Sequence, residues 1–162
     1  MSYNILMIVN PKAGKAKISK FTPEIIRNLQ KQNYKVITRY TGKDKNAKNI
    51  VKDYYEPYDI VLVCGGDGTL NEVVTGNLLR KKKLTLATLP MGSTNDVGNM
   101  YGLNKSIFQN LENVLSGKIK NIDVCYINET PFVYVACLGD YIDMVYNTPR
   151  SLKRKYGKVA YY

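Results

Sequence analysis

The chain has 162 residues, of which 44% are hydrophobic and 23% charged, a composition typical of a globular protein rather than a disordered or fibrous one. It contains no histidine, which excludes a histidine-based catalytic triad, metal site or pH switch within this chain. No apolar run is long enough for a transmembrane helix. The net charge of +11 favours a polyanionic partner, such as nucleotide phosphate, an anionic membrane or nucleic acid.

The cysteines and the N-terminus indicate the compartment. Cys64, Cys125 and Cys137 lie in apolar stretches, and three cysteines cannot all pair with one another. We interpret them as reduced core residues of a cytosolic protein. The N-terminus has no basic leader before its first apolar run at residues 5–9, so we expect no signal peptide.

The first 121 residues alternate between strand patterns and helix patterns. Short apolar runs predict strands at residues 5–9, 36–40, 60–64 and 84–89. Apolar residues at helical spacing predict helices at 18–29, 47–54, 70–78 and 107–115. Thr22 and Pro23 predict an N-cap and a first helical residue, and Ser106 with Gln109 predicts a capping box. This alternation predicts an α/β fold: an open parallel sheet with helices on both faces.

The pattern changes near residue 121. Residues 122–127 and 132–138, separated by a turn-like segment, predict a β-hairpin and the start of an antiparallel β domain. We therefore expect an α/β domain at residues 1–121 and an incomplete β domain at residues 122–162. A hairpin and one helix make a poor core, so we interpret the chain as part of a longer protein.

The loop after the third predicted strand carries the strongest functional signal. Residues 65–69, here called the glycine loop, have the sequence Gly-Gly-Asp-Gly-Thr. The glycines let a ligand approach backbone N–H groups, and the N-terminus of the following helix favours phosphate. Asp67 is unfavourable beside phosphate unless it receives a proton or meets a metal or cation. The alternative is a tight strand-to-helix turn in which Asp67 is a capping residue. The loop is not a Walker motif.

Two further loops follow predicted strands. Residues 10–14, the Asn-Pro loop, form a rigid turn flanked by Lys12 and Lys15, although an ordinary turn would look the same. Residues 90–96, the Ser-Thr loop, place Ser93 and Thr94 where they could donate to phosphate, whereas Asn95 and Asp96 could be plain N-caps. Because ligands of open parallel sheets bind at the carboxyl ends of the strands, we expect the three loops to form one site.

These three loops, in this order, resemble the diacylglycerol kinase catalytic-domain family, especially its bacterial soluble members. Residues 139–143 and 155–161 also look like the continuation of that family. The resemblance implies an ATP-dependent kinase of phospholipid biosynthesis that transfers the γ-phosphoryl group of ATP to a lipid hydroxyl, such as that of diacylglycerol. It implies Mg²⁺ as a cofactor. It also implies that residues 1–121 bind nucleotide and that residues 122–162 begin a β-sandwich domain for the lipid substrate.

The resemblance assigns site residues one by one. The residues expected to contact ATP are Asn10, Pro11, Lys12, Ala13, Gly14, Thr41, Gly65, Gly66, Asp67, Gly68, Thr69, Leu70, Asn71, Ser93 and Thr94. Asp67 is also the expected catalytic residue, which organises Mg²⁺ or orients the acceptor hydroxyl. No metal ligand is assigned here, because the family's further acidic motifs lie in the C-terminal half of its fold. Ser93 departs mildly from the family pattern, because it keeps the hydroxyl of the common threonine, whereas Ala13 replaces a common serine and removes one possible phosphate donor.

The resemblance also implies where the protein works. We expect a cytoplasmic protein that meets its lipid peripherally, at the anionic inner face of the membrane, with no nucleic-acid partner and with a homodimer left open. A basic helix at residues 150–158 is the first candidate for the membrane face, although an amphipathic helix docked on its own β domain would look the same; residues 12–20 and 80–83 follow. Two alternatives stay open: a soluble kinase like NAD kinase, and a non-catalytic basic domain that binds nucleotide or nucleic acid. The sequence does not reveal the acceptor lipid.

Overall fold

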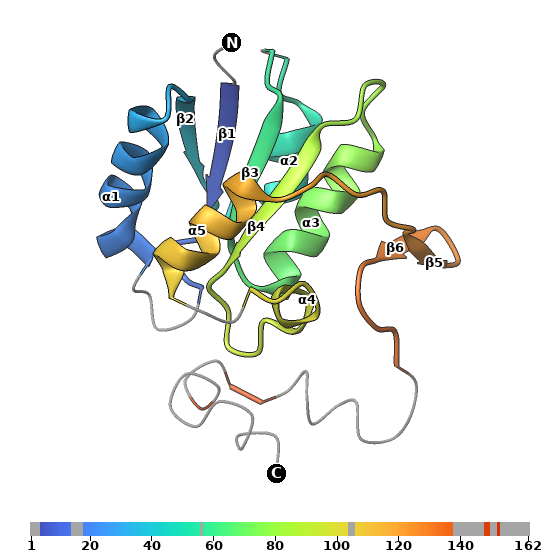
Figure 1. The fold of residues 1–162 in the computed structure, drawn as a ribbon. Coiled ribbons are helices and arrows are strands. Elements are labelled where there is room, and N and C mark those ends of the chain that lie inside the picture. Colours follow the sequence, from blue (N-terminus) through green and yellow to red (C-terminus); the bar gives the residue numbers. More distant parts are fainter. Residues whose placement is uncertain are drawn as a thin grey trace.

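A parallel four-stranded sheet forms the centre of the protein in the computed structural model (Figure 1). The structure describes residues 4–13, 18–55, 57–103, 106–137, 148–149 and 152. The strand order is β2-β1-β3-β4, and all neighbouring pairs are parallel. The strands are β1 (Asn4–Val9), β2 (Lys35–Tyr40), β3 (Ile60–Gly65) and β4 (Thr85–Pro90). The predicted fold class and all four predicted strands are confirmed, with bounds that differ by a residue at some ends.

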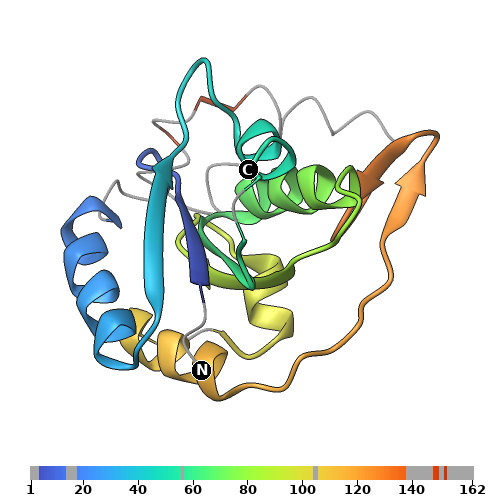
Figure 2. The same ribbon diagram turned by 90° about the horizontal axis from the view of Figure 1, so that it is seen from above.

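Helices cover both faces of this sheet (Figure 2). On one face, α1 (Ile18–Lys31) and α5 (Ile107–Ser116) bury their apolar residues against alternate residues of the strands. On the other face, α2 (Ala47–Lys52) and α3 (Asp67–Leu78) do the same. Both faces of β1 and β3 are therefore buried, which explains why these two strands are continuous apolar runs rather than alternating ones.

The helix starts were predicted with mixed success. The capping box at α5 is confirmed, because Ser106 accepts from the Gln109 amide and the Gln109 side chain accepts from the Ser106 amide. The predicted N-cap at Thr22 is wrong. The helix begins at Ile18, and the Thr22 hydroxyl donates to the Ile18 carbonyl inside α1 (2.9 Å). Burial of Ile18, Ile25 and Leu29 stabilises this helix despite the amide N–H missing at Pro23.

No range was predicted for one short helix, although Asn95 and Asp96 were considered as N-caps. α4 (Asp96–Met100) follows the Ser-Thr loop at the carboxyl end of β4. Its preceding residue, Asn95, has a left-handed backbone (φ 55°) and does not cap the helix with its own side chain. The start of α4 therefore depends on a partner from elsewhere in the chain.

The hairpin exists, but its strands are shorter than predicted, and the second strand overlaps the predicted range 132–138 only at Phe132. β5 (Cys125–Ile127) and β6 (Thr130–Phe132) pair antiparallel. The tight connection places Asn128 in the left-handed region (φ 51°), which asparagine tolerates. Cys125 and Cys137 are exposed, so the prediction that all three cysteines lie in the core is correct only for Cys64. The basic segment at residues 150–158 lies outside the described residues except for Leu152.

Candidate functional site at the carboxyl edge of the sheet

The candidate site lies where the direction of the fold reverses. From β1 the chain continues to β2 on one side, whereas from β3 it continues to β4 on the other side. The carboxyl ends of β1 and β3 are adjacent, with Val9 opposite Cys64 in the register. The Asn-Pro loop follows β1 and the glycine loop follows β3, so both lie at this topological switch point, where open α/β sheets bind their ligands.

Asn10 joins the Asn-Pro loop to the glycine loop. Its side-chain amide donates to the hydroxyl of Thr69 (2.8 Å), and its side-chain oxygen accepts from the Lys12 backbone amide (3.0 Å). Its own amide donates to the Cys64 carbonyl (3.0 Å), which extends the ladder between β1 and β3 by one bond. One asparagine thus fixes both the turn of its own loop and the first turn of α3.

Each glycine of the glycine loop meets a different environment. A Cβ on Gly65 would lie 2.7 Å from the Thr69 Cβ, and a Cβ on Gly66 would lie 3.0 Å from the Gly92 Cα. Gly68 is different, because a Cβ built there has no atom within 4 Å. Gly65 and Gly66 are therefore required by packing within the protein. Gly68 leaves open space at the start of α3, where the backbone N–H groups of the first turn have no acceptor within the helix.

Asp67 connects the glycine loop to α4. One carboxylate oxygen (Oδ2) accepts from the Thr94 hydroxyl (3.2 Å) and the Asp96 amide (3.1 Å), and the other (Oδ1) accepts from the Val97 amide (3.1 Å). Asp67 is therefore a capping residue, but it caps α4 rather than the helix to which it belongs. The sequence suggested a capping role as the alternative for Asp67. The structure gives Asp67 such a role, on a helix that is distant in the sequence.

The Ser-Thr loop is held against the glycine loop by Asn95. Its side chain accepts from the Gly92 amide (2.5 Å) and donates to the Gly92 carbonyl (3.2 Å), which keeps Gly92 in contact with Gly66. The Thr94 hydroxyl is occupied by Asp67. Ser93 is exposed, and no described residue hydrogen-bonds to its hydroxyl. Of the two hydroxyls in this loop, that of Ser93 is therefore the one available to a phosphate.

The remaining predicted residues divide between the site and the core. Thr41 lies just beyond β2, and its amide donates to the Val9 carbonyl (2.9 Å), so it borders the Asn-Pro loop. Leu70 packs in the core with 8% of its surface exposed and can offer only its backbone. Asn71 lies on α3, with its side-chain nitrogen 3.5 Å from the Pro131 carbonyl. Pro11 is half-buried, Ala13 is buried, and Gly14 lies outside the described residues.

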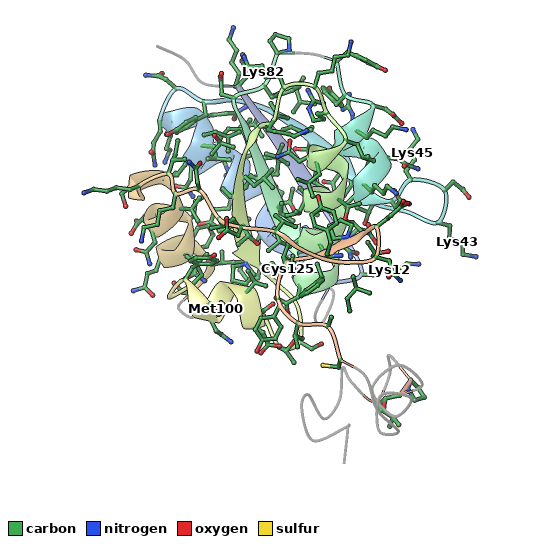
Figure 3. All side chains as sticks on the ribbon, turned by 90° about the vertical axis from the view of Figure 1, so that its right-hand side faces the viewer. Lys12, Lys43, Lys45, Lys82, Met100 and Cys125 are labelled. Atoms are coloured by element: carbon green, nitrogen blue, oxygen red, sulfur yellow. The ribbon has the colours of Figure 1, made fainter. Side chains whose placement is uncertain are left out.

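Two lysines that lie at this edge of the sheet were not identified from the sequence. Lys43 and Lys45 lie in the loop between β2 and α2, where the Gly42 amide donates to the Lys45 carbonyl (2.9 Å). Figure 3 shows Lys12, Lys43 and Lys45 on the same side of the molecule. All three are exposed. Their position directly after the carboxyl end of β2 was the signal in the sequence, because that end adjoins β1 in the predicted sheet.

The ionisable groups of the site limit its chemistry. Burial raises the pKa of the Cys64 thiol to about 12, so this residue before the glycine loop is not a thiolate base or nucleophile. Among the described residues, no three of His, Cys, Asp or Glu gather to hold a metal ion. Asp67 faces hydroxyl and amide donors instead.

Comparison of the sequence with known proteins identifies the family to which it is similar. A family model described as the diacylglycerol kinase catalytic domain matches residues 4–127. A diacylglycerol kinase of Staphylococcus aureus (strain bovine RF122 / ET3-1) is 32% identical over 157 residues, which cover 96% of this chain and 50% of the relative. A diacylglycerol kinase of Staphylococcus saprophyticus is 30% identical over 157 residues, which cover 96% of this chain and 52% of the relative.

The fold is also similar to solved structures. A crystal structure of a diacylglycerol kinase from Bacillus anthracis str. Sterne superposes with a TM-score of 0.68 and 26% sequence identity. The match covers 80% of this chain and 45% of that protein. The chain spans about half the length of the curated relatives it matches.

Proposed function

The chain belongs to the diacylglycerol kinase catalytic-domain family, and from this premise we propose that it forms the ATP-binding half of a lipid kinase. The proposed reaction transfers the γ-phosphoryl group of ATP to the hydroxyl of a lipid such as diacylglycerol. The observation that carries the proposal is the hydrogen bond from Asn10 to Thr69 across the switch point, beside the open space at Gly68. It supports one phosphate site made from the Asn-Pro loop and the glycine loop.

The proposed phosphate contacts come mainly from backbone. The first turn of α3 offers free N–H groups and the positive end of a helix of 12 residues. Gly68 allows a phosphate oxygen to approach these groups without a side chain in the way. Ser93 offers a hydroxyl from the other side of the loop. This arrangement suits phosphoryl transfer, which needs positioning and charge neutralisation more than covalent chemistry.

Cationic side chains supply the remaining charge neutralisation in this proposal. Lys12, Lys43 and Lys45 extend from the two loops that follow β1 and β2. A long flexible lysine can follow a phosphate group as a point charge without a preformed fork geometry. Mg²⁺ is proposed as the cofactor from the family alone, and no step is assigned to it.

The lipid side of the reaction is proposed from the family. None of the helices in the described part of the chain has the length and apolarity needed to cross a membrane. We propose that the protein meets its lipid at a membrane surface, with the basic segment at residues 150–158 as the first candidate for that face. The run at residues 80–83 is a weaker candidate, because Arg80 and Lys83 donate to backbone carbonyls of the protein itself.

The direct test is a kinase assay of the full-length protein with labelled ATP and Mg²⁺. Candidate acceptors are diacylglycerol, a monoacylglycerol, a sphingoid base and NAD, with products separated by chromatography. The proposal expects label in a phospholipid product, with diacylglycerol as the best acceptor. Label in NADP instead would identify a soluble nucleotide kinase. ATP binding without transfer to any acceptor would contradict the assignment as a kinase.

A further inference from the structure

We propose that Asp67 is a positioning residue that holds α4 and the Ser-Thr loop against the glycine loop, and so couples nucleotide binding to the order of α4. The nucleotide in this inference rests on the function proposed above. Asp67 was expected to act on Mg²⁺ or on the acceptor hydroxyl. The structure assigns its carboxylate a different task, within the protein.

The hydrogen bonds of Asp67 define this task. Both carboxylate oxygens are engaged, and the three donors all come from residues 94–97, at the start of α4. Two of them are the backbone amides of Asp96 and Val97, which are among the amides that a helix cannot satisfy internally. The carboxylate therefore caps the first turn of α4 and binds the Thr94 hydroxyl at the same time.

α4 depends on this cap because few other interactions stabilise the helix. A helix of five residues is unstable by itself, since nucleation is unfavourable at that length. Asn95 is left-handed and supplies no side-chain cap of its own. Val97 is buried in the core, and a Cβ on Gly98 would lie 2.7 Å from the Pro90 Cβ. The helix is therefore held by packing on β4 and by the carboxylate of Asp67.

The same contact reaches the proposed phosphate site. Asp67 is the first residue of α3 and lies next to Gly68, where the structure leaves open space. Gly66 touches Gly92 directly, and Asn95 fixes the backbone of Gly92 from the other side. A phosphate bound at the first turn of α3 would restrict Asp67, and Asp67 would in turn restrict α4. By linkage, whatever orders α4 must also favour nucleotide binding.

Substitutions of the acceptor, Asp67, and of one donor, Thr94, each remove hydrogen bonds between α3 and the start of α4. In Asp67→Asn, a side-chain NH₂ replaces one carboxylate oxygen and faces a backbone N–H, so at least one hydrogen bond is lost and two donors oppose each other. Thr94→Val removes only the hydroxyl that donates to Asp67 and leaves the carboxylate in place. Thr94→Ser keeps the hydroxyl and serves as the conservative variant that should restore the contact.

The first measurement is amide hydrogen exchange in the full-length protein without nucleotide. Exchange at residues 96–100 should accelerate about tenfold or more in Asp67→Asn and about threefold or more in Thr94→Val, because an opening equilibrium follows the lost hydrogen bonds. Thr94→Ser should exchange within about twofold of the wild type. Unchanged exchange at residues 96–100 in both Asp67→Asn and Thr94→Val would overturn the proposal. This experiment needs neither ATP nor a lipid, so its outcome is independent of the proposed function.

The second measurement adds ATP at saturation. In the wild type, ATP should slow exchange at residues 96–100, and in Asp67→Asn this slowing should be lost while ATP still binds. If ATP binds the wild type but leaves exchange in α4 unchanged, the coupling is contradicted. If ATP does not bind at all, the proposed function fails, and the nucleotide-free experiment alone decides the role of Asp67.

Discussion

At the amino edge of the sheet, the loop between α3 and β4 carries the basic run Arg80–Lys83. At the carboxyl edge, the glycine loop, which spans the end of β3 and the start of α3, carries three glycines and one aspartate. The sequence suggested that both could serve an anionic partner, one through its charge and the other through its backbone. In the structure, the two edges differ in which polar groups remain free to bind a ligand.

Two of the four basic side chains at the amino edge are used inside the protein. Arg80 donates to the carbonyl of Val51 (2.7 Å) in the last turn of α2 and to that of Tyr54 (2.6 Å) just after this helix. Lys83 donates to the carbonyl of Leu78 (2.6 Å) and to that of Arg80. These carbonyls lie at the negative ends of α2 and α3, where a cation is favourable. A run of basic residues is therefore not in itself an anion site.

At the carboxyl edge, the side chains bind one another and leave the backbone open. Asn10 binds Thr69, Asp67 binds Thr94, and Asn95 binds the backbone of Gly92. The first turn of α3 and the space beside Gly68 stay free among these contacts. The comparison teaches that free backbone donors, rather than a local excess of charge, mark the ligand-binding edge. The predictions below test this contrast.

The largest effect is expected from Asp67→Asn. In the full-length protein, kcat should fall by about 10²-fold or more, because the groups around the phosphate lose their fixed positions. Steady-state kinetics with saturating ATP and diacylglycerol would measure it. Turnover close to that of the wild type would show that Asp67 matters neither as a positioning residue nor as a catalytic one.

At the amino edge, Arg80→Ala should reduce stability and leave the nucleotide site intact. The free energy of unfolding should fall by about 2 kcal/mol, because backbone carbonyls lose a charged donor. Lys81→Ala is the matched control, since Lys81 is the exposed neighbour, and its effect should stay within about 0.5 kcal/mol. Urea denaturation would measure both. A clear loss of ATP affinity in Arg80→Ala would erase the contrast between the two edges.

The buried thiol before the glycine loop should give the protein a specific sensitivity to alkali. The pKa of Cys64 is raised from 9.0 to about 12 by burial, so between these values the unfolded chain releases a proton that the folded chain keeps. The free energy of unfolding should therefore fall with rising pH across this window, with a contribution of about 1.4 kcal/mol per pH unit. Below pH 9 the thiol is neutral in both states and the contribution is fully present.

Cysteine variants separate the contribution of this thiol to the pH dependence of stability from the contributions of lysines and tyrosines. Cys64→Ala should show a shallower decline of unfolding free energy with pH than the wild type. Cys125→Ala, which removes an exposed thiol, should decline as the wild type does. Equal slopes in all three proteins would mean that Cys64 is not protected from ionisation by the fold.

The sequence predicted the sheet well because its signals are local. Buried parallel strands are short apolar runs, and the capping box of α5 lies within four consecutive residues. The three loops followed from the strands, since the carboxyl ends of parallel strands share one edge. Their approximate position therefore required no knowledge of the contacts between them.

The predictions that failed depend on contacts between residues far apart in the sequence, which local sequence patterns do not reveal. The first amides of α4 are capped by Asp67, 29 and 30 positions earlier in the chain, whereas the local candidate Asn95 binds Gly92 instead. Thr22 and Pro23 carry a local signal for a helix start, but burial of Ile18 extends the helix past them. The occupied hydroxyl of Thr94 and the free one of Ser93 could not be distinguished by sequence either. Both outcomes depend on where Asp67 lies.

Glycine substitutions within α3 separate the site from the core. Gly76→Ala places a methyl group against the Lys48 carbonyl where α2 and α3 pack closely, so it should destabilise the fold by about 1 kcal/mol or more. Gly68→Val meets no protein atom within 4 Å of its Cβ, and valine is no worse than glycine in a helix, so stability should be nearly unchanged. Chemical denaturation of the two variants would measure this difference.

The central claim is that ATP phosphates bind at the first turn of α3, in the space beside Gly68. Titration calorimetry of ATP into the full-length wild type and Gly68→Val tests it most directly, because the variant fills that space without disturbing the fold. The account predicts that Gly68→Val raises the Kd for ATP about tenfold, equivalent to about 1.4 kcal/mol of binding free energy. A Kd equal to that of the wild type, in a variant of unchanged stability, would contradict it.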